Sequence, residues 1–170
     1  MPEPVKRRAR SGGPRSGSPR SAARLAAVQA LYQVEMTGIS GKLATAEFVT
    51  HYLGQEIDGD AYLPADEALF RELVTGTIEH QAELDPMIAR LLTADWPLDR
   101  LEMILRAILR AAAFELAQRI DTPARVVITE YVDIAHAFFA GKEPGLINGV
   151  LDRLARQCRP AEWADRSDAG

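Results

Sequence analysis

The chain has 170 residues, 47% of them hydrophobic, and a single cysteine, Cys158. This length suits one domain or two small subdomains with a shared core, and a lone thiol excludes an internal disulfide and fits a reducing cytoplasm. The sequence contains no apolar run of about 18 residues, so we expect no membrane span.

Charge is distributed unevenly along the sequence. Seven cations and one acid in residues 1–24 leave +6 there and −10 in the remainder, for a net charge of −4. Residues 1–20 are rich in Pro, Gly, Ser and Arg and lack apolar periodicity, which predicts a disordered basic arm. Its cations favour a polyanionic partner, while an inert tail and a transit peptide stay open as alternatives. The arm arginines are Arg7, Arg8, Arg10, Arg15 and Arg20.

Apolar periodicity predicts four helices in the first part of the body, which we expect to span 21–159. Ser21 is the expected cap of the first helix and Gly38 its end, and Pro86 is expected at the first position of the fourth. Period-two alternation, which would indicate strands, is missing. The four expected ranges are 21–37, 43–53, 65–81 and from 85 to the break at 95–98.

Three more helices are expected after this break, at 99–120, from Pro123 to Phe138, and at 145–157. The alanine run 111–113 predicts close packing around a central helix. Thr122 is the expected cap of the second of these helices, and its Glu130 is expected to face outward. Residues 160–170 are predicted to form a flexible tail. The chain is therefore predicted to be all-α, with about seven helices.

Signatures of catalysis are missing from the sequence. It has no Gly-rich phosphate loop followed by Lys-Ser/Thr and no Gly-x-Ser-x-Gly elbow. Asp58-Gly59-Asp60 lacks the later ligands of a calcium loop, and the residues around His80 do not gather three metal ligands. Cys158 has no fitting histidine and is expected to be structural. We therefore predict a binding module that is not an enzyme and needs no cofactor or metal.

Four blocks of the sequence carry a family pattern: 24–33, 107–116 with 120–123, 127–130, and 147–152. In order and spacing they resemble the NusB family of bacterial transcription antitermination factors. The resemblance implies two packed three-helix bundles with an additional helix. It also implies a non-catalytic protein that binds the boxA element of rRNA leader transcripts together with NusE, a ribosomal protein. That complex joins elongating RNA polymerase with other Nus factors.

The resemblance also implies RNA-binding positions. Arg20 and Arg24 match basic positions of the family's Arg-rich start, and we expect both to contact phosphates from the surface of the first helix. Family members often have Phe where this chain has Leu146, so Phe138 or Phe139 is expected to stack on a base instead.

Three further residues of the matching blocks have two interpretations each. Tyr32 either stacks on a base or belongs to the core. Asn148 either reads a base edge or caps the last helix. Close helix packing would explain Gly149.

Two other functions stay open at this point. NusB-like domains also occur with rRNA cytosine methyltransferases, so the chain could be a detached module serving such an enzyme. Some family members form homodimers, so the chain could also be a homodimer whose RNA binding is blocked by self-association.

Overall fold

The computed structural model describes residues 18–51, 53, 56–57, 60–61 and 65–167. The expected arm, with Arg7, Arg8, Arg10 and Arg15, lies outside the described residues, as do Asp58 and Gly59. Among the helices of the described ranges, none is long and apolar enough to cross a membrane. The helices are α1 (Pro19–Thr37), α2 (Gly41–His51), α3 (Glu67–Ala89), the 3-10 turn η1 (Leu98–Arg100), α4 (Met103–Gln118), α5 (Ala124–Phe138), α6 (Glu143–Cys158) and α7 (Ala161–Ser167).

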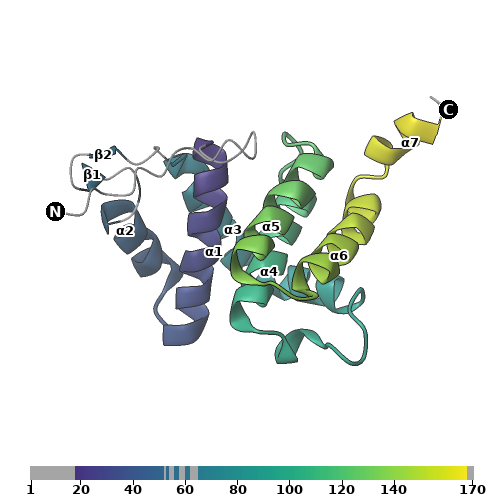
Figure 1. The fold of residues 1–170 in the computed structure, drawn as a ribbon, viewed down its shortest axis with the longest axis horizontal. Helices are drawn as coiled ribbons and strands as arrows, with labels where there is room; N and C mark the ends of the chain where they lie inside the picture. The colour runs from purple at the N-terminus through teal and green to yellow at the C-terminus, as the bar shows by residue number, and fades with distance from the viewer. Residues whose placement is uncertain (1–17, 52, 54–55, 58–59, 62–64, 168–170) are drawn as a thin grey trace.

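The helices form two bundles that lie side by side (Figure 1). Helices α1, α2 and α3 pack against one another, as do α4, α5 and α6. The bundles meet where α4 lies against α1 and α3, and α7 follows α6 as an additional helix. The predicted all-α fold of two three-helix bundles is confirmed. It is supplemented by a short antiparallel pair, β1 (Glu56–Ile57) and β2 (Asp60–Ala61), that the sequence did not indicate.

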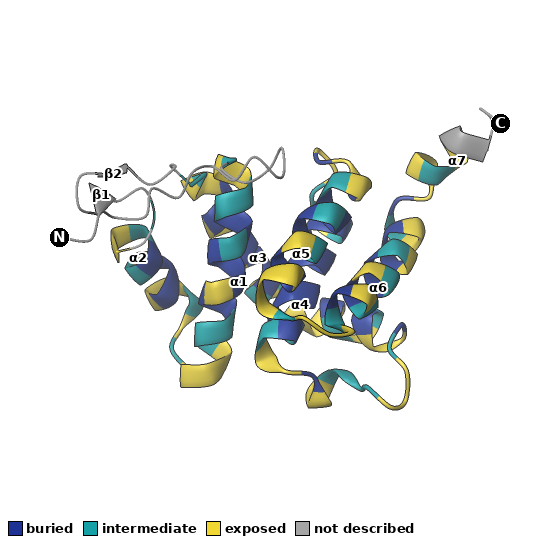
Figure 2. Ribbon diagram, viewed as in Figure 1, coloured by how far each residue is buried: buried dark blue, intermediate teal, exposed yellow. Residues whose placement is uncertain are grey.

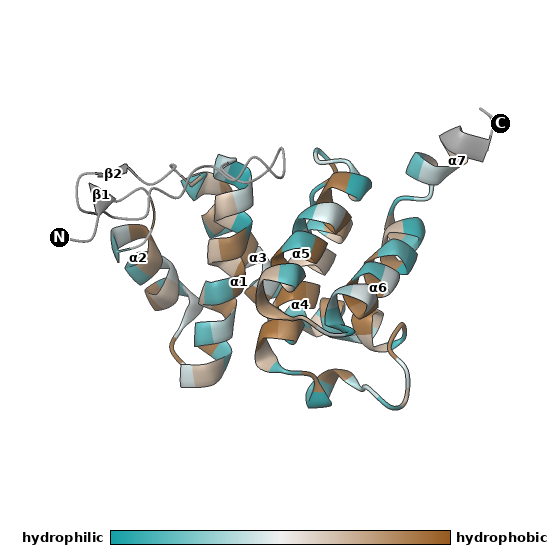
Figure 3. Ribbon diagram, viewed as in Figure 1, coloured by the Kyte–Doolittle hydropathy of each residue, from teal (hydrophilic) through white to brown (hydrophobic). Residues whose placement is uncertain are grey.

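Helix α4 is the centre of the core. Its faces toward the other helices are buried (Figure 2), and the apolar residues gather there (Figure 3). The run Ala111, Ala112 and Ala113 is fully buried, so small side chains let neighbouring helices approach, as predicted. The closest approach is at Gly76 of α3, where an added Cβ would lie 2.1 Å from Cζ of Phe114. Only glycine fits there.

The start of α1 differs from the prediction. Ser18, not Ser21, caps the helix: its Oγ accepts hydrogen bonds from the amides of Arg20 and Ser21, and Pro19 occupies the first turn. Proline suits this position because its missing N–H would have no helical acceptor there. The expected end is confirmed, since Gly38 has a left-handed φ of 75°.

The prediction of two helices between residues 65 and 95 was wrong. Helix α3 is continuous and carries Pro86 in its last turns. Proline in a helix removes one backbone hydrogen bond and usually breaks the helix. Here Leu84 and Ile88 on either side of it are buried in the core, and Asp85 binds Arg110 of α4 through two hydrogen bonds of 2.8 and 2.9 Å. These tertiary contacts stabilise the helical conformation on both sides of Pro86.

The predicted cap of α5 was also wrong, and one of the two alternatives for Asn148 is excluded. The N-cap of α5 is Pro123, and the hydroxyl of Thr122 instead accepts a hydrogen bond from Arg20. Helix α6 begins at Glu143, so Asn148 lies inside the helix and does not cap it. A Cβ on Gly149 would meet no atom within 4 Å, so close packing does not explain this glycine either.

Helix α7 occupies the segment that was expected to be a tail. The partly buried Trp163 packs against the core and lies under the guanidinium groups of Arg125 and Arg156, at 5.8 and 5.2 Å from the ring centre. Arg159, before α7, is buried and donates to the carbonyls of Glu115, Leu116, Arg119 and Thr122. It therefore links carbonyls at the end of α4 to the turn before α5, and the Glu115 carbonyl accepts from the Arg119 amide as well.

Candidate nucleic-acid interface

Arg24 is not on the surface, contrary to the prediction. Its side chain is 2% exposed, and it donates two hydrogen bonds of 2.8 and 2.9 Å to the carboxylate of Glu115, which is itself fully buried. The carboxylate of Glu130 lies 3.9 Å from the same guanidinium. Burial alone would lower the pKa of Arg24, but the hydrogen bonds and charge of Glu115 outweigh it, so the pKa is raised. A guanidinium held in this way is not available to an RNA phosphate.

The cluster around Arg24 joins the start of α1 to α4 and α5. Glu130 is buried, where we expected it to face outward, and its carboxylate accepts a hydrogen bond from the Ser21 hydroxyl at 2.8 Å. Tyr131 is completely buried beside it, and burial together with the charge of Glu115 raises its pKa well above the usual value. The buried polar groups thus fix the orientation in which α1 meets the second bundle.

Arg20 is the cation of this region that faces solvent. Its side chain is 45% exposed, donates to Thr122 Oγ1 at 3.0 Å and lies 3.9 Å from Asp121. Burial by itself would raise the pKa of the Asp121 carboxyl, but the charge and hydrogen bond of Arg119, the backbone hydrogen bond of Asp121 and the charge of Arg20 together lower the pKa below its usual value. An exposed pair of this geometry is weak, so Arg20 can exchange Asp121 for a phosphate at little cost.

The aromatic and amide candidates have different environments. Phe138, the last residue of α5, is 41% exposed, and Asn148 on α6 is also exposed. Phe139 and Tyr32 are half-buried, and Phe139 packs against the core. Phe138 and Asn148 are therefore the two candidates with free surface, on helices α5 and α6 that pack together.

Arg20 and Phe138 lie toward opposite ends of α5. Arg20 contacts Thr122 and Arg24 lies near Glu130, so α1 and α5 advance in the same direction from that end. From there to Phe138, α5 rises about 20 Å at 1.5 Å per residue. The two residues are therefore too far apart to line one compact pocket.

Other arginines of the described residues form ion pairs with carboxylates. Arg106 donates to Glu35 at 2.9 Å, and Arg119 lies 3.3 Å from Glu72. These carboxylates neutralise part of the positive charge of the described body, and the sequence before α1 adds five cations, Lys6, Arg7, Arg8, Arg10 and Arg15.

These features describe a helical binding module, and the comparisons with known proteins place it in a family. The model of the NusB family matches residues 21–156, and the chain belongs to this family. The chain is similar to the transcription antitermination protein NusB of Nitrobacter hamburgensis, with 54% identity over 84% of this chain and 89% of the relative. The NusB of Bradyrhizobium sp. strain ORS 278 is 49% identical over 96% of this chain and 98% of its own. The chain is therefore a transcription antitermination factor, of a family without enzymatic activity.

Solved structures show the same fold. Thermotoga maritima NusB superimposes with a TM-score of 0.70 at 27% identity, over 86% of this chain and 98% of the other. The crystal structure of the antitermination factors NusB and NusE in complex with double-stranded RNA matches with a TM-score of 0.65 at 25% identity, covering 82% and 97% of the two chains. The relatives carry the antitermination name, which favours an antitermination factor over a detached module of an rRNA methyltransferase.

Proposed function

We propose that this protein acts in the cytoplasm, where it binds boxA RNA of rRNA leader transcripts together with NusE and joins the RNA polymerase elongation complex with other Nus factors. A solved structure of similar fold contains NusB, NusE and RNA, which supports both partners. The observation that carries the proposal for this chain is the capped start of α1. There the cation-rich sequence 1–17 enters the body beside the exposed Arg20.

The proposed contacts divide into two kinds. Arg20 and the arginines before it supply phosphate contacts, which give affinity but little sequence information. Phe138 supplies a face for base stacking, and Asn148 supplies an amide that can read a base edge. Tyr32 and Phe139 offer only part of their rings, and Arg24 is removed from the set because it is buried. The arm arginines are Arg7, Arg8, Arg10 and Arg15.

Fluorescence anisotropy with labelled boxA RNA, in the presence of NusE, tests the phosphate contacts. Deletion of residues 1–17 keeps the Ser18 cap and removes five cations, Lys6 among them. On a single strand the slope of log K against log salt is about −0.7 per neutralised phosphate, so the deletion should reduce it by up to ~3.5. An unchanged slope would show that the arm does not contact RNA.

Single substitutions test the RNA contacts that are proposed for residues of the helical body. Phe138→Ala should weaken boxA binding by about 1–3 kcal/mol if the ring stacks on a base. Asn148→Ala should lower the preference for boxA over a scrambled RNA, because a base-edge contact carries sequence information. Arg20→Gln should weaken both RNAs equally. Arg71→Gln is the matched control, since Arg71 is an exposed helix arginine of α3 paired with Glu67. Equal binding by all of these variants would exclude the proposed surface.

Self-association is tested in the same samples. A homodimer that covers Phe138 would show twice the chain mass in light scattering and convert to a heterodimer when NusE is added. If the chain keeps the dimer mass in the presence of NusE, the proposed complex does not form.

A further inference from the structure

Two arginines from different parts of the chain point at one carboxylate in the turn between α4 and α5. The Nη2 atom of Arg119, which directly follows α4, lies 3.1 Å from Oδ2 of Asp121. The Nη2 atom of Arg20 in α1 lies 3.9 Å from the same oxygen. The Arg20 Nη2 also donates to the hydroxyl oxygen of the buried Thr122 at 3.0 Å, which holds the guanidinium in this direction. The two cations therefore share one acceptor at the surface.

The shared carboxylate is accessible to solvent. The side chain of Asp121 is 59% exposed, and that of Arg20 is 45% exposed. Asp121 belongs to a turn, so rotation about its side-chain bonds moves the carboxylate away without any change in α4 or α5. Exposed ion pairs are weak, because solvent screens both charges. An anion from solution can therefore reach the guanidinium atoms that Asp121 now contacts.

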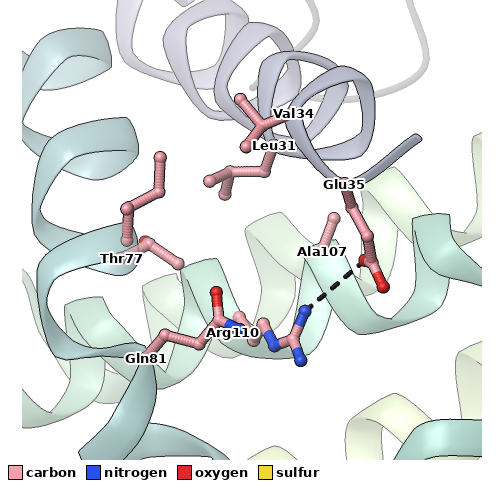
Figure 4. A pocket seen from close by; sticks show the side chains of 8 residues that line it. Leu31, Val34, Glu35, Thr77, Gln81, Ala107 and Arg110 are labelled. Atoms are coloured by element: carbon pink, nitrogen blue, oxygen red, sulfur yellow. Dashed lines mark hydrogen bonds and ion pairs between the residues drawn. The ribbon is translucent and has the colours of Figure 1, made fainter. Parts of the chain in front are cut away.

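The ion pairs between α1, α3 and α4 do not allow this exchange. The side chain of Arg110 is 14% exposed, as is that of Arg119, but Arg110 donates to both oxygens of Asp85 at 2.8 and 2.9 Å. Its guanidinium also lies 3.4 Å from Glu35 of α1 (Figure 4). These two carboxylates are only 28% and 29% exposed. Arg119 differs because Asp121 contacts it through one oxygen and lies mostly in solvent.

The point between the two arginines favours a negative charge. Burial by itself raises the pKa of the Asp121 carboxyl, but the charge and hydrogen bond of Arg119, a backbone hydrogen bond and the charge of Arg20 together lower this pKa. Glu72 of α3 lies 3.3 Å from Arg119, so two carboxylates balance the two cations in the free protein. An incoming anion therefore gains a free cation only when it displaces Asp121.

A phosphate of an RNA backbone suits this position. It has two free oxygens, and arginine is well matched to phosphate because its planar guanidinium donates through several N–H groups. A phosphate can therefore accept hydrogen bonds from both guanidinium groups at once. Asp121 does not do so, because its Oδ2 is 3.9 Å from Arg20 and thus beyond hydrogen-bond distance.

We propose that Arg119 and Arg20 together bind one RNA phosphate, and that the carboxylate of Asp121 occupies the position of this phosphate in the free protein. The inference rests on the proposed binding of boxA RNA, since Arg20 follows the cation-rich sequence 1–17 closely. RNA must displace Asp121, which lowers the affinity. The affinity for every RNA is lowered to the same extent, because phosphate contacts carry little sequence information.

Replacement of Asp121 by asparagine tests the competition. Asp121→Asn keeps the size of the side chain and removes its charge. In anisotropy with NusE present, it should bind boxA and a scrambled RNA about twofold to fivefold more tightly than the wild type. Asp152→Asn is the matched control, because Asp152 is an exposed carboxylate that also lies 3.1 Å from an arginine, Arg156. The control should leave the affinity nearly unchanged, because salt screens charges that are not in contact.

Replacement of Arg119 tests the second cation. Arg119→Gln should weaken the binding of both RNAs about tenfold, the effect of one hydrogen bond to a charged group. In this background Asp121→Asn should not improve binding more than Asp152→Asn does. The double variant Arg20→Gln with Arg119→Gln should reduce the slope of log K against log salt by about 0.7, the value for one shared phosphate. A reduction of about 1.4 would mean two separate phosphates and would overturn the inference.

The same titrations distinguish this inference from the proposed function. If the wild type binds boxA but Asp121→Asn has the affinity of Asp152→Asn, the inference fails and the proposed function stands. Wild-type affinity of Arg119→Gln leads to the same conclusion. If Arg119→Gln does not fold, the comparison of the two asparagine variants still decides. Absence of boxA binding by the wild type with NusE would refute the proposed function, and this inference with it.

Discussion

Replacement of Arg24 by glutamine should unfold the protein more readily and leave its RNA contacts intact. The substitution leaves the carboxylates of Glu115 and Glu130 buried without the cation that lies between α1, α4 and α5. Removal of one partner from a buried ion pair costs about 3–5 kcal/mol, because the other charge stays desolvated. For a chain of this size each kcal/mol lowers Tm by about 2–4 °C, so the expected decrease is roughly 6–20 °C.

Differential scanning calorimetry on matched variants measures this effect. Arg20→Gln removes an arginine one helical turn away that is half-exposed, and should change the free energy of unfolding by less than about 1 kcal/mol. The double variant Arg24→Met with Glu115→Leu should recover part of the loss, since an apolar pair has no charge to desolvate. If Arg24→Gln keeps the wild-type Tm yet binds boxA as weakly as Arg20→Gln, the structural role of Arg24 is refuted.

Three more outcomes are expected. Gly76→Ala should destabilise the protein by about 1–3 kcal/mol in urea unfolding, because its Cβ would clash with the ring of Phe114. Trp163→Ala should cost about 2 kcal/mol and increase proteolysis at α7, since apolar burial and two cation–π contacts are lost. Burial raises the pKa of the Cys158 thiol more than the nearby Arg159 lowers it, so less thiolate is present near neutral pH. Iodoacetamide should therefore alkylate the native protein more slowly than the urea-unfolded chain, with a rate that rises at higher pH.

Each of these three predictions has a control or an outcome that would contradict it. Gly145→Ala places its Cβ in open space on α6 and should not destabilise as Gly76→Ala does. A proteolysis pattern of Trp163→Ala identical to that of the wild type would mean that the ring does not hold α7. Equal alkylation rates in the native and unfolded protein would mean that the Cys158 thiol is fully accessible.

Periodicity was sufficient to predict the helical fold because each helix carries its buried face in its own sequence. The stripe of α1 and the alanines of α4 are local signals, and so is the αL glycine that ends α1. The continuity of α3 was missed because Pro86 is a strong local stop signal. Tertiary contacts override this stop signal, namely the two hydrogen bonds from Arg110 and the burial of Leu84 and Ile88.

The burial of Arg24 could not be predicted from the residues around it. Arg24 follows Arg20 by four positions and lies close to a basic arm, a pattern that is typical of solvated surface arginines. Its partner Glu115 is 91 residues away, and the helix pattern alone does not pair two helices so distant in sequence. One signal was present: a carboxylate inside the apolar run of α4, where an unpaired charge would be costly, indicates a buried counter-ion.

The contacts of Arg159 have a consequence for how the protein is made. A nascent chain leaves the ribosome from its N-terminus, so α4 emerges long before the arginine that binds the carbonyls at its end. Until Arg159 is outside the exit tunnel, the carbonyls of Glu115 and Leu116 lack its guanidinium as a donor, and the second bundle lacks its final polar contacts. Translation products that stop before Arg159 would contain every helix from α1 to α6 and still expose the weak end of α4. The cell's proteases would therefore distinguish nearly complete chains from complete ones at this position.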